Sequence, residues 1–233
     1  MQMDSMPKFL RLCLLALAIV TAGCIIDENG SSRDSGEYLD SYFPLNPKLV
    51  RKYLVTSYSD SQKTLSYSER SFAGKRTING KEYYILETEG TDRPSYYRME
   101  NDVLYRYYFE GEKINVPYSH EEPILDLTKN TGESWMVVSS TITEETVETV
   151  YTVKATFQGM ETVETIAGTF TDCARFDTRE SVVYTPVNNN TGETLILETY
   201  YRSWYAKRIG LVKVIAEGNL LGNYIIDLYS YSL

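Results

Sequence analysis

The sequence predicts an all-β protein formed by a single antiparallel, strongly curved sheet of about ten to twelve strands. Three observations support this fold class. Apolar and polar residues alternate with a period of two along most of the chain after residue 38. The pair Asn79-Gly80, a strong signal for a hairpin, separates two such stretches. All 21 tyrosines lie between Tyr38 and Tyr231, and tyrosine favours half-buried, pleated surfaces.

The clearest strand pattern covers residues 147–157. One face would consist of every second residue, namely Val147, Thr149, Tyr151, Val153, Ala155 and Phe157. The opposite face is mostly polar, so the pattern is typical of a half-buried strand. Residues 103–109 and 195–201 repeat the alternation. No segment after residue 38 keeps a helical period for three turns, and helices are therefore not expected.

Turn residues separate these stretches at short intervals. Besides Asn79-Gly80, residues 100–102, 143–145 and 188–192 are rich in Asn, Asp, Glu or Gly and indicate turns. Short connections make neighbouring strands antiparallel. A sheet this wide would expose two edges and one face if it were flat, so we expect an open barrel or half-barrel, with a sandwich as the alternative.

The amino terminus has the composition of an export signal. Basic residues at 8–11 precede an apolar run from Leu12 to Val20, which is too short to span a bilayer, and small residues at 21–23 precede Cys24. This arrangement resembles a bacterial lipobox, with an ordinary secretory signal and a chance cysteine as the alternative. The resemblance implies that residues 1–23 are removed and that Cys24, carrying palmitate or similar acyl chains, becomes the first residue of a lipoprotein.

The same resemblance implies an address in the cell envelope. Ile25 follows the cysteine in place of the Asp that retains many lipoproteins at the inner membrane, so we expect the outer membrane, facing the periplasm. Residues 24–41 are mostly small and polar and are expected to form a flexible tether. The folded domain is expected over residues 42–233, since Phe43 to Pro47 favours extended backbone.

Charge limits the partners. Without residues 1–23 the chain has 21 basic and 31 acidic side chains, a formal charge of −10. An acidic surface argues against nucleic acid, whose binding requires Lys and Arg at the phosphates. It also argues against charge-driven docking on anionic lipid, so contact with the membrane is expected through the lipid anchor. No later stretch approaches 18 apolar residues, and no second span is expected.

Three phrases in the second half resemble a family of uncharacterised bacterial lipoproteins and periplasmic proteins. They are Gly132-Glu133-Ser134-Trp135, then Ala167 to Cys173, then Tyr205 to Lys213. The family shows these phrases as G-x-S-W, a-G-x-F-x-x-C and Y-A-x-G-x-G-L-V-K. The resemblance implies a β-rich envelope domain and provides no catalytic residues.

Few residues offer chemistry. His120 is the only histidine and lies in a Pro-flanked segment with Glu121 and Glu122, where we expect a solvated loop. Cys173 would be the only free thiol after processing and is expected to be buried, with intermolecular pairing as the alternative. A pairing of Cys173 with His120 would make a hydrolase, but no G-x-S-x-G motif, P-loop or dinucleotide fingerprint occurs. We therefore expect no catalytic residues, cofactor or metal.

The sequence thus predicts a non-enzymatic, membrane-anchored envelope lipoprotein that acts by binding. One hypothesis is a hydrophobic ligand held on the concave face of the sheet. The alternative is a scaffold or assembly subunit that binds other envelope proteins.

Overall fold

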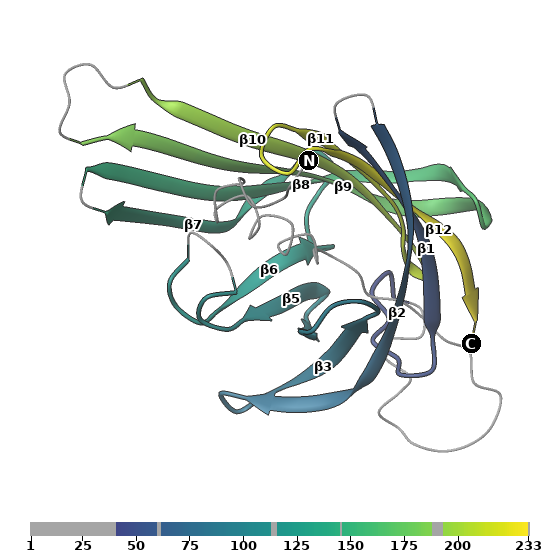
Figure 1. Ribbon diagram of the computed structural model, residues 1–233. Coiled ribbons are helices and arrows are strands. Elements are labelled where there is room, and N and C mark those ends of the chain that lie inside the picture. The colour runs from purple at the N-terminus through teal and green to yellow at the C-terminus, as the bar shows by residue number, and fades with distance from the viewer. Residues whose placement is uncertain (1–40, 60–61, 113–115, 145, 188–192, 233) are drawn as a thin grey trace.

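The computed structural model describes residues 41–59, 62–112, 116–144, 146–187 and 193–232 (Figure 1). The expected signal segment, Cys24 and nearly all of the expected tether lie outside the described residues. The described residues form twelve strands and no helix: β1 (Val50–Ser59), β2 (Gln62–Ile78), β3 (Lys81–Thr88), β4 (Ser95–Glu100), β5 (Val103–Tyr108), β6 (His120–Asp126), β7 (Ser134–Glu144), β8 (Val147–Thr165), β9 (Gly168–Pro186), β10 (Leu195–Ala206), β11 (Gly210–Gly218) and β12 (Asn223–Ser232).

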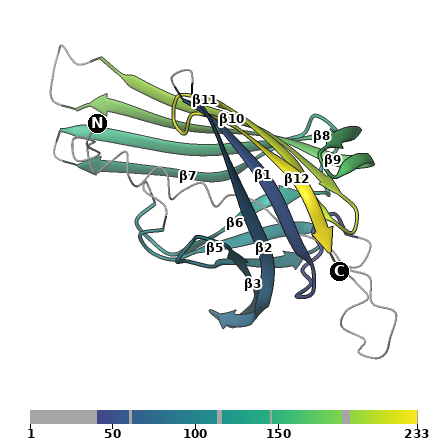
Figure 2. The same ribbon diagram turned by 45° about the vertical axis from the view of Figure 1, so that its right-hand side comes forward.

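All twelve strands belong to one antiparallel sheet, which confirms the predicted fold class and strand number. The order is β6-β5-β4-β3-β2-β1-β12-β11-β10-β9-β8-β7. The sheet curls until its edge strands β6 and β7 approach each other, giving a nearly closed barrel (Figures 1 and 2). At this seam the indole Nε1 of Trp135 donates a hydrogen bond to the Pro123 carbonyl at 2.8 Å. Pro123 is tolerated in β6 because an edge strand can lack a backbone donor.

The predicted turns form where the chain requires left-handed backbone. Asn79 and Gly80 have φ of 50° and 77°, and Asn101 and Asp102 have φ of 51° and 61°. Two consecutive positive φ angles are the geometry that fits the twist of a two-residue hairpin. Residues 188–192 lie outside the described residues.

One expectation about local structure is wrong. Residues His120 to Asp126 form edge strand β6 rather than a solvated loop, and Glu122 is 1% exposed. The cross-strand partner of Glu122 is Arg106, and the partner of His120 is Tyr108. These long-range neighbours on β5 supply the pairing that the polar sequence of the segment does not reveal.

The segment before β1 packs into one end of the barrel. Phe43 is fully buried, with its ring 5.1 Å from that of Tyr205 and 6.2 Å from that of Phe176. Leu45 and Leu49 are also buried. This end of the barrel is therefore filled by apolar side chains.

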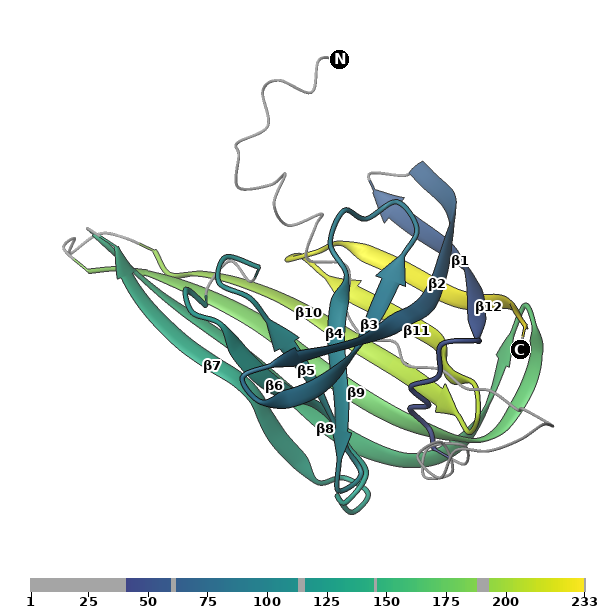
Figure 3. The same ribbon diagram turned by 90° about the horizontal axis from the view of Figure 1, so that it is seen from below.

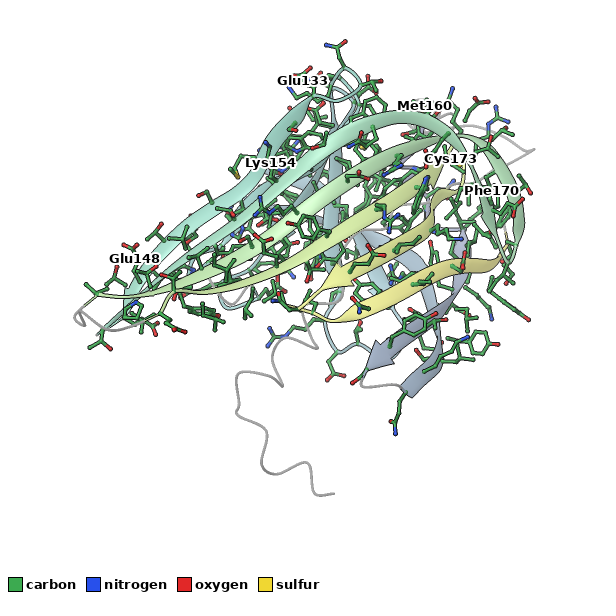
Figure 4. All side chains as sticks on the ribbon, turned by 90° about the horizontal axis from the view of Figure 1, so that it is seen from above. Glu133, Glu148, Lys154, Met160, Phe170 and Cys173 are labelled. Atoms are coloured by element: carbon green, nitrogen blue, oxygen red, sulfur yellow. The ribbon has the colours of Figure 1, made fainter. Side chains whose placement is uncertain are left out.

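The other end is uneven, because β7 to β10 continue well beyond β5 and β6 (Figures 1 and 3). We call the part of these four strands beyond Ser140, Tyr151, Val182 and Leu197 the projecting arm. Figure 4 shows Glu148 at the end of this arm and Phe170 at the opposite end of the β8–β9 hairpin.

Candidate binding site

The barrel interior contains a small cavity whose walls come from the eight strands β5 to β12. Its lining residues are Tyr108, Glu122, Ile124, Val137, Tyr151, Val153, Thr178, Glu180, Tyr201, Ser203, Val214 and Tyr224. The cavity volume is about 40 Å³. Because one water needs about 10–15 Å³, it holds about three waters. An acyl chain does not fit inside the closed part of the barrel.

The cavity wall is polar on the side of β8, β9 and β10. The carboxylate of Glu180, 6% exposed, accepts hydrogen bonds from the hydroxyls of Tyr151 and Tyr201, each at 2.7 Å. Burial raises the pKa of both tyrosines, and the Glu180 charge raises it further. Both phenols are therefore neutral donors near neutral pH and compensate part of the cost of burying the carboxylate.

A second buried acid lies across the cavity on β6. Glu122 accepts a hydrogen bond from His120 Nε2 at 2.7 Å, and His120 Nδ1 lies 3.0 Å from the Tyr118 carbonyl. A carbonyl and a carboxylate are both acceptors, so a ring nitrogen of His120 that carries a hydrogen donates to the group it faces. The ring also stacks on Tyr108 at 5.4 Å. Both ring nitrogens are thus engaged in holding β6, which leaves none of them facing a substrate.

The cavity-facing side of the sheet continues onto the projecting arm. The register pairs Thr199 with Glu180, then Leu197 with Val182, then Leu195 with Tyr184, without a bulge between them. Paired residues share a face, and every second residue returns to it. On β7 and β8 the same face carries Ile142 and Val147. We call Ile142, Val147, Tyr184, Leu195 and Leu197 the concave strip.

The concave strip is apolar but only partly covered. Leu195 is 53% exposed, and the other four side chains are half-buried. The neighbouring Ile196, which lies on the opposite face, is 51% exposed. An apolar strip that leads out of a polar, nearly filled interior can bind an apolar ligand along the arm without requiring a large cavity.

Cys173 is fully buried, as predicted. Its Sγ lies 3.5 Å from the Phe170 carbonyl oxygen and 3.9 Å from that of Thr171. Burial raises the pKa of the thiol to about 12, assisted by the charges of Asp172 and Glu161. Arg175 forms its ion pairs with Glu161 and Asp177. The contacts of Cys173 differ from those of His120, so the structure does not assemble the hypothetical Cys–His pair.

Within the described residues, no group of three or more His, Cys, Asp or Glu side chains is placed to hold a metal ion. In the same part of the chain there is no helix of the length and hydropathy that crossing a membrane requires.

Sequence reasoning missed Glu180 and wrongly expected Glu122 to be solvated, because each lies in a polar stretch of the sequence. The alternation over 195–201, which placed Leu195, Leu197 and Tyr201 on one face, contained the signal for the concave strip. The alternation did not show that β10 continues beyond the closed part of the barrel.

The architecture is that of a nearly closed, twelve-stranded antiparallel barrel with a partly exposed apolar arm. A family model described as DUF3108-like matches residues 55–216, and the chain belongs to this family. The match includes all three phrases of the predicted resemblance, which is thereby confirmed. A search of curated proteins finds no match.

Two solved structures are similar in outline. One is a candidate lipoprotein from Parabacteroides distasonis, with 14% identity, a TM-score of 0.47, and coverage of 82% of this chain and 98% of that one. The other is a candidate exported protein with a YmcC-like fold from Bacteroides fragilis, with 12% identity, a TM-score of 0.44, and coverage of 81% and 97%.

Proposed function

We propose that this chain is a non-enzymatic lipoprotein of the bacterial outer membrane, anchored through Cys24, that binds an apolar ligand on the concave strip. The lipobox-like segment at residues 21–24 supports the anchor. Engagement of both His120 nitrogens and the high pKa of Cys173 support a role without catalysis.

One observation carries the choice of site. The apolar face that is buried at Val182 continues along the arm to Leu195, where half of the side chain is exposed. An apolar ligand lying there would bury this area and gain the corresponding hydrophobic free energy. The cavity in the closed interior, with a volume of about 40 Å³, is too small for such a ligand.

The arm provides its own matched control. Leu195 and Ile196 are adjacent, similarly apolar and almost equally exposed, but they lie on opposite faces. With a fluorescent fatty acid as the probe, we expect Leu195→Ser to weaken binding about tenfold, which corresponds to the loss of about 1.4 kcal/mol of apolar contact. Ile196→Ser should leave the affinity unchanged. Equal effects of the two substitutions, or no binding by the parent, would overturn the choice of site.

A scaffold function is the second candidate. The arm also exposes Ile196 on its outer face and Val187 just after β9, so it can be inserted between protein surfaces. A photo-crosslinking amino acid at position 195 in intact membranes separates the two candidates. Adducts with lipid support the ligand-binding function, whereas stable adducts with an envelope protein support the scaffold.

A further inference from the structure

One row of side chains on the outer face of the barrel crosses four strands without a charge. Ile215 of β11 pairs with Ile225 of β12. Ile225 pairs in turn with Thr56 of β1, and Thr56 pairs with Leu65 of β2. Paired residues share a face, and successive side chains of a strand alternate between faces, so these four side chains lie together outside the barrel. We call Ile215, Ile225, Thr56 and Leu65 the outer row.

The two ends of the outer row differ in shape. At the β2 end, Leu65 is 55% exposed, and Tyr67, two residues further on the same face, is 67% exposed. At the β11 end, Ile215 and Ile225 are half-buried and line a shallow groove together with Tyr58. The four strands are neighbours in the sheet and form one side of the barrel (Figures 1 and 2). One surface thus has protruding apolar side chains at one end and an apolar hollow at the other.

The two ends also carry opposite charges. Lys63 lies two residues before Leu65 on β2, and Glu217 lies two residues after Ile215 on β11. The antiparallel register places both of them on the same side of the outer row, and both are exposed. Glu217 forms an ion pair with Arg202 at 2.9 Å, in which the Glu217 side chain keeps 61% exposure. A positive and a negative side chain therefore flank the two ends of an uncharged row.

We infer that a second copy of this chain packs on the outer row, with the two-fold axis running along the strands between β1 and β12. This axis lays β2 of each copy over β11 of the other. Leu65 then enters the groove at Ile215 of the other copy, and Lys63 faces Glu217. A two-fold interface requires such a self-complementary surface, with matching features on either side of the axis. The protruding leucine, the groove and the opposite charges provide those features.

This interface goes beyond the proposed function and depends neither on the anchor nor on the ligand. The chain has a formal charge of −9, so two copies repel each other over most of their surfaces. The outer row contributes no charge to this repulsion, and the two-fold axis creates two attractive pairs between Lys63 and Glu217. Face-to-face packing of two sheets also removes apolar side chains from water on both copies.

Analytical ultracentrifugation of the full chain tests the interface. Detergent micelles are kept in large excess, so that two chains share a micelle only if they bind each other. We expect a dimer that dissociates on dilution and that Leu65→Ser weakens about tenfold or more. Ile196→Ser, at a 51% exposed side chain on the arm, should leave the dimer unchanged. Leu65→Ser should keep the parent's affinity for fatty acid, which separates this test from that of the concave strip.

A charge exchange tests the predicted pairing. Lys63→Glu and Glu217→Lys each place like charges across the interface, and each alone should weaken the dimer about tenfold. The double variant restores two opposite pairs and should regain the parent's affinity. Circular dichroism checks that each variant is folded. A parent that stays monomeric at about 100 μM, a double variant no better than the single ones, or a different protein bound at Leu65 would overturn the inference.

Discussion

At the scale of single residues, the barrel interior is organised around buried charge. Glu180 accepts hydrogen bonds from two tyrosine hydroxyls, and Glu122 accepts one from His120 and lies opposite the buried Arg106 of β5. Removing one partner of a buried carboxylate leaves part of its desolvation cost uncompensated. Polar side chains therefore define this interior as much as apolar packing does, which is why we place the proposed apolar ligand on the arm.

His120→Ala tests the structural role of the histidine. The variant removes the 2.7 Å hydrogen bond to Glu122 and the stacking on Tyr108. We expect a loss of about 1–3 kcal/mol in the free energy of unfolding, measured by urea denaturation. His120→Gln, which keeps one donor, should lose less. Fatty-acid binding should be unaffected by either variant when measured on folded protein, and a variant that binds no ligand while remaining stable would contradict the role.

At the scale of elements, a polar network ties β3, β4 and β6 together on the outer face. Glu121 accepts hydrogen bonds from Tyr83, Arg98 and Lys81; the Arg98 Nη2 and Lys81 contacts measure 2.7 and 2.9 Å. Burial alone would raise the pKa of Glu121, but these donors outweigh it and lower the pKa to about 2. The ionised form is thus strongly favoured in the folded protein.

This lowered pKa predicts acid sensitivity. A carboxylate whose folded pKa lies below its unfolded value stabilises the fold above about pH 4.5, and the contribution is lost as the pH falls toward 2. Glu121→Gln should therefore flatten the unfolding free energy between pH 5 and about 2. Glu217→Gln, at an exposed pair with Arg202, should keep the parent's dependence. If the unfolding free energy of Glu121→Gln falls between pH 5 and about 2 as steeply as that of the parent, this network is not the cause of the acid sensitivity.

The β11–β12 connection depends on a close backbone approach at Gly218. A Cβ at this position would lie 2.1 Å from the Glu198 carbonyl oxygen, which also accepts hydrogen bonds from Asn219 and Leu220. Gly218→Ala must displace backbone rather than a flexible side chain. We expect it to destabilise the fold by about 3 kcal/mol in thermal or urea unfolding.

Gly222→Ala is the matched control for this turn. Gly222 has a φ of 77°, and a Cβ at this position would have nothing within 4 Å, so only conformational strain of about 1 kcal/mol is expected. If the two substitutions cost the same, steric contact with Glu198 is not the reason for the glycine at position 218.

Local signals explain how far the elements were predictable. The strands over 103–109, 147–157 and 195–201 and the turn at Asn79-Gly80 follow from period and turn chemistry, which depend on adjacent residues. Strand β6 does not follow from such local signals, because the partners of Glu121 and Glu122 lie on β3, β4 and β5. The same holds for Glu180, whose burial is set by Tyr151 and Tyr201 on neighbouring strands.

At the scale of the whole molecule, the two ends of the β8–β9 hairpin have different surfaces. The Phe170 end receives the start of the described chain through the hydrogen bond from Tyr42 to Asp172, and the Glu148 end carries the concave strip (Figure 4). The closing of β6 toward β7 leaves only a small interior cavity between them. This difference between the two ends was not predictable from the sequence, because it depends on strands of unequal length in one sheet.

Native mass spectrometry of the protein purified gently from membranes tests the proposed acylation and the proposed binding of an apolar ligand in one experiment. We expect a polypeptide that begins at Cys24 and carries acyl chains, together with a non-covalent apolar adduct that disappears in Leu195→Ser and persists in Ile196→Ser. An unmodified polypeptide, or an acylated one that never carries an adduct, would contradict it.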